Sequence, residues 1–374
     1  MSIANKYNRD MRIKTLTLFS WLVVFLAVSL FSQTTSAELF DDLVCQDSEI
    51  RQKAFYRFDS SDAGLKENIT RRLIERSYSS ANQPDDQALK VLINIGASAI
   101  SPAIKVIEDV TFAERNPWVD ICLNAGKGAI PELRKFLTSD RVHSAAAASL
   151  MLKIDPENDE AASHISRILK ASNEEKMTIF CLRALSTAAK PTAPEIQTVI
   201  IRLENPGSIR DAALNCLNKF GSRASASAAD VLKVLKTESK EGRIIPLKVL
   251  GNLGESSFEA VPYLCELAAN EDIVLRLNVL RVIGEIGVDP ARSVPVLEAS
   301  LSHEDEFVRA AAAEALGRFD RKAYLSVQAL SKALMSSKLN YTQDKIVQAL
   351  RAIGTADALA AVDKFRKEIR QKKK

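Results

Sequence analysis

Three histidines and five cysteines are the residues of this sequence best suited to hold a metal ion or to act as nucleophiles. The histidines, His143, His164 and His303, lie far apart, and none has a second His or Cys at metal-ligand spacing. We expect His143 and His164 in loops or on the surface. No glycine-rich phosphate loop, Ser-His-Asp set or Cys-His pair stands out. We therefore predict no catalytic residue, no metal site and no cofactor, and we expect that the protein is not an enzyme.

Charged residues instead recur at a fixed interval. Four arginines follow one another at steps of 33 residues: Arg210, Arg243, Arg276 and Arg309. The last two are preceded, one helical turn earlier, by Asp272 and Asp305. An arginine placed in this way can bond to the aspartate of its own repeat and to carboxylates or carbonyl groups of the next repeat. We predict that these six residues form a structural ladder between repeats; the alternative is an anion-binding stripe.

A turn residue stands eleven positions after each arginine and closes a shared pattern, as in "LNKFG" and "IGEIG". The same signature recurs along the chain at spacings of 29–37 residues. Asp or Ala occupies the turn at positions 59, 155, 189 and 320. Glycine, which adopts the left-handed conformation that ends many helices, occupies the others. We predict that these glycines cap the first helix of their units: Gly96, Gly126, Gly221, Gly254, Gly287 and Gly354.

Each unit is predicted to contain two helices. Apolar residues recur at helical spacing, and "AIPEL", "AVPYL" and "SVPVL" place proline where a second helix is expected to start. The alanines of "EDEFVRAAAAEALGRFD" (304–320) allow neighbouring first helices to approach closely. The sequence therefore predicts an all-α fold, an α-solenoid (armadillo-like superhelix) of about ten helix pairs.

The unit resembles a HEAT repeat. Its length, its alanine-rich first helix and the "AIPEL" and "AVPYL" segments are similar to the short HEAT-like repeats of phycobilisome lyases. The resemblance covers about residues 40–370. It implies a scaffold that binds proteins along a concave face lined by second helices. The alternative that it implies is a lyase-like protein that handles a tetrapyrrole or another small cofactor. The HEAT-like deoxyhypusine hydroxylases build a di-iron site from several His-Glu pairs, whereas this sequence has only His303-Glu304.

Residues 1–37 have the order of a secretory signal. Basic residues come first, an uncharged run follows at 15–31, and small polar residues precede Glu38. We expect cleavage after Ala37, which makes the protein exported, periplasmic or secreted, with a repeat array at 38–363 and a basic tail at 364–374. The alternative is an uncleaved anchor at 15–31 that holds the array outside the cytoplasm. This segment is the only expected contact with a membrane.

The charge of the remaining chain excludes one class of partner. Without residues 1–37 the net charge is +1, and the tail contains seven basic residues against one acidic residue. The body of the array is therefore slightly acidic, whereas a nucleic-acid binder needs a basic face. We predict a protein or peptide partner, of unknown identity, and no nucleic acid.

The cysteines are expected to be structural. An odd number of dispersed cysteines is neither a disulfide framework nor a zinc pattern. Cys122, Cys181 and Cys216 occupy apolar helix positions and are expected to be small buried side chains. If an oxidising compartment allows one disulfide, Cys181 and Cys216 are the expected pair, because they fall in neighbouring units.

Overall fold

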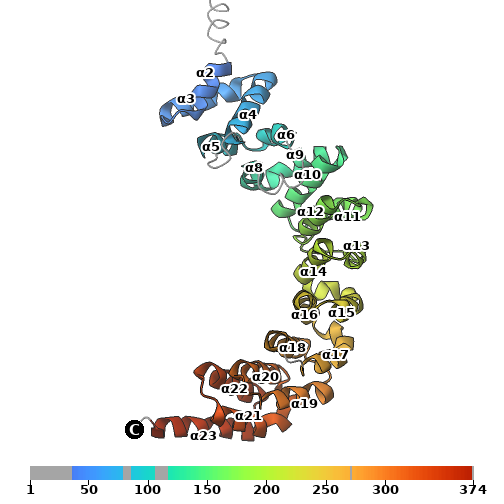
Figure 1. Cartoon of the computed structure of the whole chain (residues 1–374). Coiled ribbons are helices and arrows are strands. Elements are labelled where there is room, and N and C mark those ends of the chain that lie inside the picture. Colours follow the sequence, from blue (N-terminus) through green and yellow to red (C-terminus); the bar gives the residue numbers. More distant parts are fainter. Residues whose placement is uncertain (1–35, 79–85, 106–116, 270–271, 373–374) are drawn as a thin grey trace, which may run out of the picture. The chain divides into compact units, whose positions relative to one another are not determined.

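The structure is a computed structural model that describes residues 36–78, 86–105, 117–269 and 272–372. The predicted hydrophobic segment at 15–31 lies outside these residues. The chain divides into two compact units, Met1–Phe136 and Leu137–Lys374. The described residues contain no β-strand, and their helices follow one another in pairs. The predicted all-α solenoid is therefore confirmed (Figure 1).

The first described helix of the first unit packs on the helices after it. α2 buries Leu39, Phe40 and Leu43, and the guanidinium carbon of Arg72 in α4 lies 4.1 Å from the Phe40 ring centroid. Ser36, the first residue of α2, accepts a hydrogen bond from Arg72 at its carbonyl oxygen (3.1 Å). The described helices of this unit are α2 (Ser36–Val44), α3 (Ser48–Ser60), α4 (Ala63–Tyr78), α5 (Asp86–Ile95), α6 (Ile100–Ile104), α8 (Pro117–Ala125) and α9 (Ile130–Arg134).

The second unit is a two-layer stack. Its first helices contact one another in one layer, and its second helices lie in the other layer, as Figure 1 shows for α16, α18 and α20 beside α15, α17 and α19. Its helices are α10 (Arg141–Ile154), α11 (Asp159–Ala171), α12 (Glu175–Leu185), α13 (Ala193–Ile201), α14 (Ser208–Phe220), α15 (Ala228–Thr237), α16 (Ile244–Leu253), α17 (Val261–Leu267), α18 (Ile273–Ile286), α19 (Pro290–Ser300), α20 (Glu306–Arg318), α21 (Val327–Ser336), α22 (Asn340–Ile353) and α23 (Ala356–Lys372).

Small side chains bring the first helices of this stack close together. In α20 four of the five predicted alanines are buried, and Ala311 is half-buried. A methyl group added to Gly284 in α18 would lie 2.8 Å from the Ala315 Cα atom of α20. One added to Gly317 in α20 would lie 3.0 Å from the Ala349 Cα atom of α22. These glycines recur at the same position of each helix because only hydrogen fits between the neighbouring backbones.

Most of the turns between first and second helices contain a left-handed residue. All six predicted cap glycines have positive φ, between 55° and 67°, and Asp320 adopts φ 49° at the equivalent position. Four other sequence predictions differ from the structure in whole or in part. Ala189 has no positive φ and lies four residues after Leu185, where α12 ends. Asp59 lies inside α3, which continues to Ser60. Asp155 ends α10 as predicted, but its backbone is extended (φ −136°) rather than left-handed. Pro295 lies inside α19, because that helix begins earlier, at Pro290 after the capping residue Asp289.

One described helical stretch, Gln87–Ile104, is long and apolar enough to cross a membrane by length and composition alone. Gly96 divides it, since its φ of 67° is left-handed and separates α5 from α6. Both helices contribute buried side chains to the first unit, including Leu92 and Ile104, each fully buried. This stretch is therefore built as a helix pair of the repeat array.

Candidate functional site

The four periodic arginines tie neighbouring repeats together. Arg309 donates from Nη1 to the carbonyl oxygens of His303 (2.6 Å) and Glu304 (2.9 Å), in the segment that follows α19. Its Nη2 lies 2.9 Å from Glu306 Oε1, and both side chains of this ion pair are nearly buried, 12% and 15% exposed. Arg309 therefore fastens the start of α20 to the end of the preceding second helix.

The other three arginines make the corresponding contact. Each donates to a carbonyl oxygen in the segment that joins the preceding second helix to its own helix. The acceptors are Leu203 for Arg210 (2.8 Å), Glu238 for Arg243 (3.3 Å) and Ala269 for Arg276 (3.3 Å). Each of these bonds uses one of the five N–H donors of its guanidinium group.

The two aspartates of the predicted ladder have a different role from the one expected. Asp305 accepts from the backbone N–H groups of Phe307 (2.8 Å) and Val308 (3.1 Å), and Asp272 accepts from Leu275 (3.0 Å). Each carboxylate thus caps the start of its helix and satisfies donors that the helix leaves open. The carboxylate that pairs with Arg309 is Glu306 instead.

Two glutamates that the sequence analysis missed extend these ties to the next repeat. Glu306 accepts from the backbone N–H groups of Lys338 (2.7 Å) and Leu339 (3.1 Å), directly before α22. Burial raises the pKa of Glu306, but these bonds outweigh it and lower the pKa below its ordinary value. Glu238, after α15, accepts from Arg210 Nη1 at 2.5 Å. No sequence signal singles out either residue, because the groups that they bond are about 30 positions away.

The histidines and cysteines do not converge on a site. Within the described part of the chain, no group of three His, Cys, Asp or Glu side chains could hold a metal ion. Contrary to our expectation, His164 is buried in α11, and burial and then the charge of Arg167 lower its pKa. His143 lies in the first turn of α10, half-buried. Cys181 and Cys216 are free thiols in the structure, so the disulfide considered for them is absent, and both are buried with Cys122.

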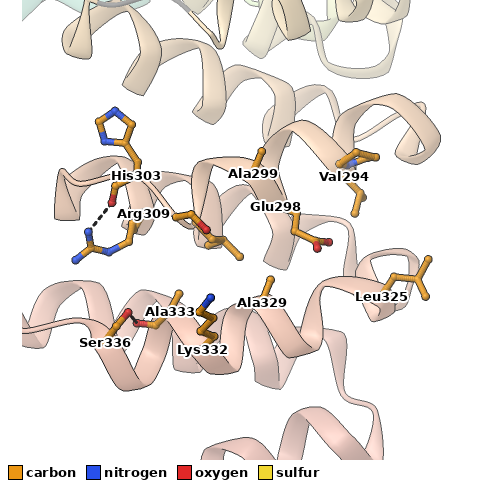
Figure 2. A pocket seen from close by; sticks show the side chains of 13 residues that line it. Val294, Glu298, Ala299, His303, Arg309, Leu325, Ala329, Lys332, Ala333 and Ser336 are labelled. Atoms are coloured by element: carbon orange, nitrogen blue, oxygen red, sulfur yellow. Dashed lines mark hydrogen bonds between the residues drawn. The ribbon is translucent and has the colours of Figure 1, made fainter.

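A groove of about 780 Å³ opens between α19 and α21, in the layer of second helices. In this second-helix groove, Glu298 of α19 and Lys332 of α21 project into the space between the two helices (Figure 2). Ser326 donates to Glu298 Oε2 (2.7 Å), which fixes that carboxylate on the wall. Leu325, 71% exposed, lies at one end.

Small side chains create this groove. Ala299, Ala329 and Ala333 line it where larger residues would let α19 and α21 interdigitate. The groove thus combines a narrow apolar surface with the fixed carboxylate of Glu298, the exposed ammonium group of Lys332 and, near its other end, His303 and Arg309 (Figure 2). Such a surface can take an extended or helical segment of another chain.

A second hollow, of about 350 Å³, lies in the layer of first helices, between α18, α20 and α22. Phe307 and Tyr341 stand at the starts of α20 and α22, with ring centroids 6.1 Å apart and planes at 45°. Both rings are about half exposed. Arg281 and Arg318 complete the wall of this first-helix pocket.

Comparison with known proteins identifies the repeats. A family model described as HEAT repeats matches residues 228–317, 261–351 and 294–368. The chain therefore contains HEAT repeats from α15 to α23, the part that holds both hollows. The finer resemblance to repeats of the phycobilisome lyase type remains a prediction. No curated protein is significantly similar to this sequence.

Solved structures with a related fold share little sequence with this chain. The Kap95:Nup1 complex has 10% identity and a TM-score of 0.47, with 85% of this chain and 48% of that chain covered. The structure in which Kap95p binding induces the switch loops of RanGDP to adopt the GTP-bound conformation has 12% identity, a TM-score of 0.46 and the same coverage. Kap121p has 14% identity, a TM-score of 0.46 and coverage of 88% and 38%. This chain thus spans less than half the length of these proteins.

Proposed function

We propose that the protein is a non-enzymatic HEAT-repeat scaffold that binds a segment of a protein or peptide partner in the second-helix groove. The groove itself supports this proposal. Three alanines line it, and it offers a fixed carboxylate, Glu298, and an exposed ammonium group, Lys332. A partner segment can therefore approach the backbones of α19 and α21 closely and pair with both charges.

A blocking substitution tests this function. Ala329→Arg fills the groove from α21, whereas Gln328→Arg adds the same side chain at the neighbouring exposed position and serves as the matched control. Each purified protein is immobilised, exposed to envelope or secreted extract, crosslinked and analysed by mass spectrometry. We expect one dominant partner on the unsubstituted protein and on Gln328→Arg, reduced at least about tenfold on Ala329→Arg.

Two outcomes contradict the proposal. A partner that stays bound to Ala329→Arg binds elsewhere. An empty pull-down from folded protein, together with visible absorbance of the purified protein, favours the alternative of tetrapyrrole or small-cofactor handling. Circular dichroism of each variant confirms that the bait is folded.

We further propose that the array acts outside the cytoplasm. The support is the charge and hydropathy pattern of residues 1–37, with a cleaved signal or an anchor at 15–31. Cleavage after Ala37 would remove Ser36, whose carbonyl oxygen accepts from Arg72, whereas an uncleaved anchor keeps this bond. Fractionation of the expressing cells, with the N-terminal residue of the recovered protein determined by sequencing, tests both forms. Recovery of the intact chain in the cytosol contradicts the proposal.

A further inference from the structure

An exposed apolar side chain is the second residue of each of three successive first helices. Val274, Phe307 and Tyr341 occupy equivalent positions of α18, α20 and α22 and are 63%, 53% and 52% exposed. Single exposed apolar residues are ordinary, but these three recur in adjacent repeats. Phe307 and Tyr341 are already in contact as a tilted pair, so a partner would meet them as one preformed aromatic surface.

The pocket beside these rings is small and has a narrow apolar floor. Ala311 and Ala315 of α20 line it between Phe307 and Arg318, one and two turns along the same helix. Its volume of about 350 Å³ is at the lower end of ligand pockets, which run from about 300 to 1,000 Å³. It therefore suits one or two bulky apolar side chains rather than a large cofactor.

Two arginines beside the pocket make only long ion pairs with neighbouring carboxylates. Arg281 Nη2 donates to Asn278 Oδ1 (3.2 Å), but its Nε is 3.9 Å from Glu285 Oε1. Arg318 Nη2 is 3.5 Å from Glu314 Oε1, and both arginine side chains are 42% exposed. Glu314, in contrast, is held by Lys345 Nζ at 2.6 Å. A hydrogen bond from Lys345 lowers the pKa of Glu314, so this carboxylate stays ionised, and the ammonium group of Lys345 balances its charge. Arg281 and Arg318 therefore make the charge that faces the pocket positive.

We infer that the first-helix pocket is a second binding surface, separate from the second-helix groove, for an acidic partner segment with an aromatic or aliphatic anchor. The anchor side chain packs over Ala311 against the Phe307 and Tyr341 rings. Asp or Glu residues next to the anchor bond to Arg281 and Arg318, which gain better-aligned carboxylates than their present intramolecular partners. Buried aromatic residues and arginines are the groups that contribute most to protein interfaces.

A displayed library of random dodecapeptides tests this inference. The purified full chain is the bait, and peptides are selected at low salt and sequenced. We expect enriched sequences that combine Phe, Tyr, Trp or Leu with neighbouring Asp or Glu. Synthetic versions of the enriched peptides are then measured by fluorescence anisotropy, where binding weakens as the salt concentration rises.

Variants assign the binding to the pocket. Arg281→Glu with Arg318→Glu, and separately Phe307→Ala, each weaken the selected peptides at least about tenfold. Ala329→Arg in the second-helix groove leaves them unchanged, which separates this inference from the proposed function. Enrichment of peptides without acidic residues, equal binding by the double variant, or no enrichment on folded protein overturns the inference.

Discussion

Gly284 provides the sharpest test of how the repeats stack. In Gly284→Ala the new methyl carbon would lie 2.8 Å from the Cα atom and 2.9 Å from the Cβ atom of Ala315 in the next first helix. Unstrained carbon contacts are about 3.5–4.0 Å. Because the opposing atom belongs to the backbone, no rotamer change relieves the overlap. Either α18 and α20 move apart by roughly 0.7 Å, or both helices distort.

Two opposing terms set the size of the effect. Alanine is favoured over glycine inside a helix by about 1 kcal/mol, which stabilises the variant. Overpacking of a close contact costs about 1–3 kcal/mol, with a contact this short at the upper end. We expect Gly284→Ala to lose about 1–2 kcal/mol of unfolding free energy, or roughly 2–6 °C in Tm for a unit of this size.

Urea and thermal unfolding followed by circular dichroism measure this loss. Gly317→Ala, whose added carbon would lie 3.0 Å from the nearest atom, should fall between Gly284→Ala and the unsubstituted protein. Gly128→Ala, with no atom within 4 Å of the added carbon, should match or exceed the unsubstituted protein and controls for the substitution itself. A Gly284→Ala protein as stable as Gly128→Ala would refute close backbone approach as the reason for this glycine.

Three further predictions follow from the contacts between repeats and from burial. Arg309→Ala should destabilise the protein by about 2–3 kcal/mol and Arg276→Ala by about 1 kcal/mol, because only the first loses a nearly buried ion pair; equal losses in urea unfolding would contradict this order. The lowered pKa of Glu306 contributes stability above its ordinary pKa of 4.5, which is lost as the pH falls through its folded value. Glu306→Gln should therefore flatten the loss of Tm on acidification, and an unchanged pH profile would argue against this role. Burial raises the pKa of Cys122 and Cys181 to about 12 and also raises that of Cys216. At pH 8 Ellman's reagent should label Cys45 and Cys265 before the three buried cysteines, which should react only after unfolding in guanidinium; rapid labelling of all five would contradict the burial of those three.

The predictions that held are those that depend on one repeat at a time. The 33-residue interval and the helical spacing of apolar residues indicate helix pairs because both are local properties of the chain. The turn glycines are equally local: a left-handed residue such as Gly287 ends a helix whatever packs against it. The errors at Asp59 and Pro295 show the limit of that reasoning, since a turn-like or proline residue also occurs inside a helix when its neighbours allow it.

The contacts that join repeats were decided by tertiary structure. The sequence suggested that Arg309 pairs with Asp305. In the folded chain Asp305 instead caps the start of α20, and Glu306 pairs with the arginine. Glu306 in turn reaches the segment before α22, more than 30 residues away, and no pattern within one repeat encodes that bond.

By itself, the sequence determined that this protein is a solenoid of helix pairs with periodic arginines and left-handed turns. The residues within one repeat are enough to specify its helices and their caps. Only the tertiary structure decided where side chains of different repeats meet. Gly284 meets Ala315, and Phe307 meets Tyr341, because stacking brings positions about 30 residues apart into contact. The second-helix groove arises in the same way, from alanines on two separate helices. The binding surfaces proposed for this protein therefore depend on the distance between helices, which stacking sets.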